Sequence, residues 1–210
     1  MKKLIIALSV LVCFSSIAPA SELIFSGAST VGGAYEYGLG IGVPAAGGTV
    51  STDNIQFEGF YRKYVEETMD WGFSLSPIDL SDFPGTINFL FDMKMKLLKE
   101  SSLIPNIVLG VNMVRTQMTT SGNTTVSFSF LDEGRIGFSK TFESYKPEKN
   151  SRVTIKKTEV YLGTFIVGNQ IDSSVIYFGL KTGSMNLMAK TGDRGGQSQD
   201  FIGISFIVSE

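Results

Sequence analysis

The 210-residue sequence contains no histidine and a single cysteine, and charged residues make up only 18% of it. Without histidine, the chain lacks the usual general base at neutral pH and the commonest metal ligand. One cysteine excludes a disulfide framework and a thiolate metal cluster. The 18 basic and 20 acidic residues nearly cancel, so the sequence carries no charge signature of nucleic-acid binding. We therefore expect a protein that is not an enzyme and that holds neither a metal nor a cofactor.

Residues 1–20 have the three parts of a secretory signal peptide. Lys2 and Lys3 form a basic start, and the apolar stretch that follows is too short to span a bilayer. Ala18-Pro19-Ala20 is a small-residue cleavage site. A membrane-anchor helix and a lipoprotein attached through the single cysteine remain as alternatives. We expect residues 1–20 to be removed and residues 21–210 to fold as one domain that contains no cysteine.

Apolar and polar residues alternate along most of the remaining chain, as in the long run 86–97. Alternation of this kind is typical of a strand with one apolar face, whereas a helix would scatter the apolar residues around its axis. A short strand at Glu22–Ser26 would raise the total from eleven to twelve. At the end of the run 152–167 both parities are apolar, which predicts a bulge or a register change there. The predicted strands cover 34–43, 54–62, 69–77, 86–97, 106–113, 125–130, 136–142, 152–167, 175–180, 185–190 and 201–208.

Alternation alone does not say whether the apolar face turns inward or outward. A soluble barrel or sandwich buries that face, whereas a membrane barrel turns it toward lipid and its polar face toward the lumen. Strands of 10–12 residues, a polar face rich in Gly, Ser and Asn, and aromatic residues near strand ends favour the membrane barrel. Glycines 38, 40 and 42 on the polar face of one strand fit a crowded lumen. In lipid every backbone polar group must be paired, so the sheet must close.

The sequence therefore predicts an all-β, closed, antiparallel up-and-down transmembrane β-barrel. We expect about twelve strands, with ten as the alternative. Its location would be the outer membrane of a diderm bacterium, reached after export and inserted by the barrel assembly machinery. Lys140 and Glu159 fall on the apolar parity of their predicted strands, so either they lie near a membrane interface or the predicted register is wrong there.

The stretch 86–113 carries a further pattern, in which a strand reaches a basic and leucine-rich turn and a proline precedes the next strand. It resembles the YjbH-type outer-membrane proteins linked to exopolysaccharide, and similar spirochaete and Thermotogota-like barrel proteins. Asn112 differs from that family, which usually has Asp there, and the chain is shorter than typical members. The resemblance implies an outer-membrane barrel and transfers no catalytic residue. The residues that carry it are Lys94, Lys96, Leu97, Leu98, Glu100, Ser101, Pro105, Gly110 and Asn112.

Charged residues on the polar parity are the candidate functional site. They would form either a pore constriction that selects solutes or a plug of mutually satisfied ion pairs. Eight-stranded barrels are filled and sixteen-stranded barrels leave a channel, so ten to twelve strands favour the plug. The residues are Glu36, Glu58, Arg62, Asp70, Asp92, Lys94 and Lys96.

These patterns favour an integral outer-membrane barrel with a structural or a narrow-pore, transport-accessory role. Its partners would be outer-membrane lipid and either small solutes or polysaccharide, and not nucleic acid. The alternative is a soluble secreted β-barrel or sandwich that binds a ligand or a protein partner. An enzyme is disfavoured because known outer-membrane enzymes generally resemble one another in using a histidine, which this chain lacks.

Overall fold

The computed structural model places strands along most of the chain after residue 34. Within the described residues, no helix is long and apolar enough to cross a membrane. The predicted signal peptide and the predicted strand at Glu22–Ser26 lie outside them. The structure describes residues 35–46, 49–50, 55–66, 68–77, 86–121, 123–131, 133–147, 153–167, 170–194 and 196–209.

All the regular structure in these ranges is β-strand. The strands are β1 (Tyr35–Ala46), β2 (Thr49–Val50), β3 (Gln56–Glu66), β4 (Met69–Pro77), β5 (Thr86–Leu98), β6 (Asn106–Ser121), β7 (Asn123–Phe130), β8 (Glu133–Pro147), β9 (Val153–Val167), β10 (Gln170–Thr182), β11 (Met185–Arg194), β12 (Gln197–Ser198) and β13 (Phe201–Ser209).

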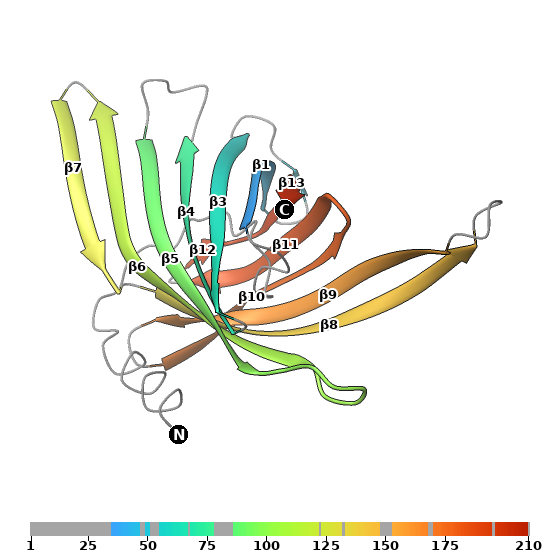
Figure 1. The fold of residues 1–210 in the computed structure, drawn as a ribbon. Helices are drawn as coiled ribbons and strands as arrows, with labels where there is room; N and C mark the ends of the chain where they lie inside the picture. Colours follow the sequence, from blue (N-terminus) through green and yellow to red (C-terminus); the bar gives the residue numbers. More distant parts are fainter. Residues whose placement is uncertain are drawn as a thin grey trace.

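Ten of these strands close into an antiparallel barrel (Figure 1). Neighbours in the wall follow chain order, β1-β3-β4-β5-β6-β8-β9-β10-β11-β13, and β13 pairs with β1 to complete the ring. The closing pairs run from Glu36 opposite Ser209 to Pro44 opposite Phe201. The predicted all-β, closed, up-and-down antiparallel barrel is therefore confirmed, with ten wall strands, which was the alternative count.

The favoured count of twelve strands was wrong: the predicted strand at Glu22–Ser26 lies outside the described residues, and two of the other eleven predicted strands share one place in the wall. β7 pairs with the second half of β6, residues 114–121, and β8 pairs with its first half, residues 106–111. The two strands therefore follow one another along the same edge of β6. Between them Leu131 has a φ of 50°, in the left-handed region. This break restarts the alternation, so the pattern counts one wall position twice.

The mixed apolar run 152–167 contains no bulge in its pairing with β8, which is continuous from Val153 to Val167. The register shift lies on the other side of β9, where Phe165 pairs with Asp172 and Thr164 pairs with Ile176 of β10, so the predicted register change falls at the end of this run. Both parities of the run are apolar because the barrel interior at this point is itself apolar. Glu159 is on the inward parity and buried, so its predicted place on the outer face was wrong.

The buried charged side chains lie on the inward parity, and large exposed apolar side chains lie on the outward parity. Along β1, Glu36 is 5% exposed and Leu39 is 70% exposed, and along β13, Ser205 is fully buried beside Phe206 at 54%. Every wall strand carries at least one large exposed apolar residue: Leu39, Val65, Phe73, Phe89, Met118, Phe138, Leu162, Phe178, Leu187 and Phe206. The buried charged residues are Glu36, Glu58, Arg62, Asp70, Asp92, Lys94, Arg115, Glu133, Arg135, Glu159 and Lys190.

Two apolar clusters complete the packing. The larger one joins inward-facing residues of β3, β9, β10, β11 and β13, namely Phe60, Tyr161, Phe165, Val175, Tyr177, Met188, Phe201 and Ile207. The Tyr177 ring lies across Gly163, where a Cβ would come within 2.3 Å of it. The smaller cluster, Met95, Leu109, Val111 and Ile166, lies on the opposite parity of the sheet and is a buried part of the outer face.

Candidate functional site: a charged network in the lumen

Asp92 is the centre of the charged network inside the barrel. On one side its carboxylate accepts hydrogen bonds from the Arg62 guanidinium, with Nη1 3.0 Å from Oδ1. On the other side Arg135 donates to the second carboxylate oxygen, also at 3.0 Å. Arg62 also contacts Asp70 at 2.8 Å, and Arg135 also contacts the Asn112 amide oxygen at 3.0 Å. All five side chains are buried, so these bonds are shielded from water.

The two arginines reach Asp92 from strands that are not its neighbours and pass a glycine on the way, and only the Gly72 crossing is too close for a side chain. Arg62 on β3 crosses Gly72 of β4, where an added Cβ would lie 2.9 Å from the Arg62 Cγ. Arg135 on β8 passes Gly110 of β6, whose Cβ would lie 3.6 Å from the Arg135 Nε. The network thus links β3, β4, β5, β6 and β8 through side chains as well as through the backbone ladder.

Two further ion pairs lie in the interior, apart from the Asp92 group. Glu36 on β1 is 2.5 Å from the ammonium of Lys181 on β10. Glu133 at the start of β8 is 3.0 Å from Arg194 of β11, and the Arg194 guanidinium lies 5.2 Å from the centre of the Phe165 ring. Buried charges of this kind are tolerated only when they are paired. The interior is therefore a balanced set of ion pairs next to an aromatic cluster.

The structure places the predicted site residues as follows. Glu36, Glu58, Arg62, Asp70, Asp92 and Lys94 are all buried on the inward parity, and Lys96 is only half-buried. Arg62, Asp70 and Asp92 form one directly bonded group, and Lys94 lies opposite Asp70 in the register of β4 and β5. Glu36 belongs to a separate pair with Lys181, and the backbone N–H of Lys96 donates to the Thr68 carbonyl at 2.6 Å.

Among the bonded groups described above, sequence reasoning missed four charged residues and one amide. Arg135 and Glu133 alternate with Gly134, Ile136 and Phe138, so the signal was present at the start of β8. Lys181 and Arg194 were missed because the predicted strands end at 180 and 190, two and four residues before the observed ends of β10 and β11. Asn112 was noticed as a departure from the family pattern and not as a ligand of an arginine. Among the described residues, no group of His, Cys, Asp and Glu could hold a metal ion.

A second polar cluster lies outside the strands, in the turn between β5 and β6. The Glu100 carboxylate accepts the Thr141 backbone N–H at 3.0 Å and the Asn106 amide at 3.2 Å, and the Lys140 ammonium lies 3.3 Å away. Lys140 also donates to the Ser101 carbonyl oxygen. Although partial burial acts in the opposite direction, these donors hold the pKa of Glu100 below its ordinary value of 4.5. The turn is thereby fastened to β8.

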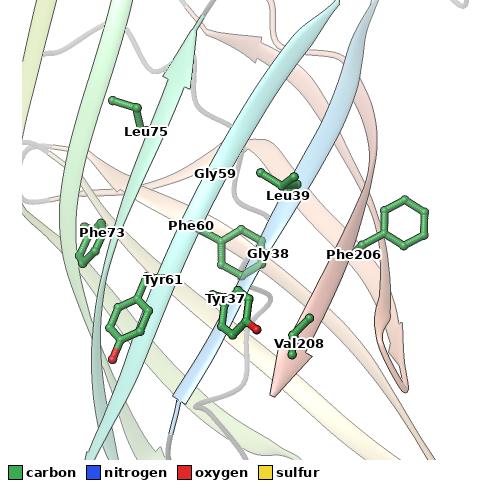
Figure 2. Close-up of a pocket in the computed structure, with 10 residues that line it drawn as sticks. All are labelled: Tyr37, Gly38, Leu39, Gly59, Phe60, Tyr61, Phe73, Leu75, Phe206 and Val208. Carbon is green, nitrogen blue, oxygen red and sulfur yellow. The ribbon is translucent and has the colours of Figure 1, made fainter. Parts of the chain in front are cut away.

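The outer face carries an apolar groove of about 560 Å³ over β13, β1, β3 and β4 (Figure 2). Its floor is Gly59, which the register places between Leu39 and Leu75. A Cβ on Gly59 would meet only the Leu39 side chain, at 3.6 Å. The remaining walls are apolar or aromatic, from Tyr37, Phe60, Tyr61, Phe73, Phe206 and Val208. The groove therefore belongs to the apolar outer surface and not to the charged lumen.

No protein-family model matches this chain, and no curated protein matches it either.

Proposed function

We propose that this protein is an integral outer-membrane β-barrel whose lumen is closed by ion pairs. The observation that carries the proposal is the sorting of side chains across the wall. Charged residues such as Asp92 and Arg62 are about 3% exposed, while residues such as Leu39 and Phe206 are more than half exposed.

This arrangement is the reverse of that in a soluble protein, which buries apolar side chains and exposes charged ones. Charged side chains are rarely buried in soluble proteins, and exposed apolar patches beyond a few hundred Å² mark a contact with protein or membrane. In a bilayer the same outward residues contact hydrocarbon instead of water. The backbone N–H and C=O groups of the wall are paired because the sheet closes on itself. A lipid environment on the outer face therefore accounts for both halves of the pattern.

A row of aromatic side chains adds support on the outer face. Tyr35, Tyr37, Tyr61, Trp71, Phe73, Phe89 and Phe91 form a chain of ring contacts with centroids between 5.3 and 6.4 Å apart. Tyr and Trp prefer the membrane interface, because one part of the ring is apolar and the other part forms hydrogen bonds with water. Tyr35 and Trp71 lie near the β1 start and the β4 start, where such an interface would meet the barrel.

The filled lumen favours a structural or narrow transport-accessory role over an open pore. Arg62, Asp92 and Tyr161 point inward from three strands, and each is 3% exposed or less. A link to envelope polysaccharide rests on the family resemblance alone.

Location is tested by expressing the full chain with its own leader in a diderm bacterium. We expect the protein in the outer-membrane fraction, resistant to alkaline and urea washes, and extracted only by detergent. We also expect unheated samples to migrate differently from boiled samples in SDS gels, since a closed barrel resists unfolding by detergent. A processed chain that stays in solution without detergent would overturn the membrane proposal and favour a soluble barrel that binds a ligand.

A further inference from the structure

β7 is an edge strand in the part of the chain that the structure describes. There it pairs with β6 alone, through all eight of its positions. The β8–β9 pairing begins only at Glu133 opposite Val167. The β6–β7 hairpin therefore rises beyond the end of β9, and β7 forms its outer side, as Figure 1 shows at the yellow arrow.

The edge has none of the features that usually keep edge strands apart. Its sequence, NTTVSFSF, has no charged residue, no proline and no glycine, and it is rich in β-formers. Val126, Phe128 and Phe130 are 47%, 65% and 67% exposed, and Thr125 and Ser127 on the opposite face are exposed as well. An exposed, neutral and partly aromatic edge is a template for another strand.

We propose that β7 pairs antiparallel with β7 of a second copy of this chain. The exposed backbone edge fits a strand, and a neutral edge meets its own copy without charge repulsion. Side chains in paired positions share a face, so Val126 and Phe128 meet apolar partners only when a two-fold axis passes through a residue position. With the axis at Ser127, Val126 lies opposite Phe128 of the second copy, and the reverse contact forms by symmetry.

This pairing uses one edge from each copy, so it stops at the dimer. The pairing is independent of the membrane proposal, because it needs only the exposed backbone edge of β7. The dimer can therefore fail while the membrane proposal holds, and the reverse is equally possible.

The test uses a single cysteine at the predicted axis. In the full chain with Cys13→Ser, the variant Ser127→Cys is purified in the medium that keeps the barrel folded and is mildly oxidised. We expect about tenfold more disulfide-linked dimer than from Ser184→Cys, a matched exposed serine in the turn between β10 and β11. Equal dimer yields from the two variants would overturn the proposal.

A second variant separates specific pairing from collision. Phe128→Lys places two like charges near the axis, and we expect the particle mass measured by light scattering to fall from dimer to monomer. The unheated gel mobility should stay that of the folded barrel. A dimer that persists in this variant would overturn the proposal. A monomer whose outward-pointing β7 amides, those not bonded to β6, are protected from hydrogen exchange would also overturn it, because another part of the same chain would then cover the edge.

Discussion

Asp92 holds together side chains that the backbone ladder leaves apart. It receives one arginine from β3 and one from β8, and each arginine passes over a strand that carries glycine at the crossing. A buried ion pair contributes little net stability compared with apolar packing, but removing one partner leaves a buried charge uncompensated. Single substitutions in the network should therefore change the free energy of unfolding more than the small net contribution of the intact ion pairs suggests.

The first prediction concerns that carboxylate. Asp92→Asn removes the negative charge that Arg62 and Arg135 share, so two buried cations would face a neutral amide. We expect a loss of about 3–5 kcal/mol in the free energy of unfolding, measured by urea titration with fluorescence of the only tryptophan, Trp71. Glu143→Gln, in a solvent-exposed pair with Lys157, is the control and should cost about 1 kcal/mol or less. Equal losses in the two variants would contradict the role given to Asp92.

The second prediction compares two glycines on neighbouring strands. A Cβ at Gly72 would lie 2.8 Å from the Tyr61 carbonyl oxygen and 2.9 Å from the Arg62 side chain, whereas a Cβ at Gly59 has room. We expect Gly72→Ala to lower the free energy of unfolding by about 1–3 kcal/mol and Gly59→Ala to leave it nearly unchanged. The same urea titration measures the free energy of unfolding of both variants. If Gly72→Ala leaves it unchanged, Arg62 does not need a glycine at the crossing.

At the scale of elements, the turn between β5 and β6 is held by one carboxylate. Glu100 receives the backbone N–H of Thr141 on β8 and the amide of Asn106 on β6, so it joins two strands and the turn. This is also the stretch in which the family resemblance is most specific. The hydrogen bonds of Glu100 therefore give this stretch a structural role that does not depend on the family resemblance.

The third prediction tests that contact through pH. Because the pKa of Glu100 is lowered in the folded protein, the carboxylate contributes stability that is fully present above its ordinary pKa of 4.5 and is lost as pH falls through the lowered value. We expect Glu100→Gln to lower the free energy of unfolding by about 1–2 kcal/mol at pH 7. The difference between wild type and variant should shrink below pH 4.5 in urea titrations. A difference independent of pH would assign the effect to packing.

Most strands could be predicted because a wall with one apolar and one polar face leaves a period of two in the sequence. The prediction failed where the wall departs from that rule. At Leu131 a left-handed residue interrupts one edge and suggests an extra strand, and along β9 an apolar interior removes the contrast between faces. The inward charges of β3, β4 and β5 were predicted for the same reason. Their partners across the lumen depend on register, which alternation does not encode.

At the scale of the whole molecule, the interior combines the charged network around Asp92 with a cluster of apolar and aromatic side chains. Both groups are buried in the part of the chain that the structure describes. Whether the barrel conducts ions can therefore be tested by replacing a few of these side chains together.

The fourth prediction is a conductance experiment. We expect the wild-type protein to give no single-channel steps in a planar bilayer, because its inward side chains fill the barrel. Replacing Arg62, Asp92 and Arg135 together by serine removes the central bonded group and most of its volume, and we expect steps to appear. Steps of equal size from both proteins would show that the ion path avoids this network. Silence from both would assign the block to the aromatic cluster, provided that the gel mobility confirms a folded barrel.

The ring closes through the pairing of β1 with β13, the first and the last of the described strands. β13 is the last described strand in the chain, so a chain that ends before it leaves the edges of β1 and β11 unpaired. Such edges invite pairing with other chains. Closure thus works as a check on completeness, since only a chain that carries Phe201–Ser209 can hide both edges at once.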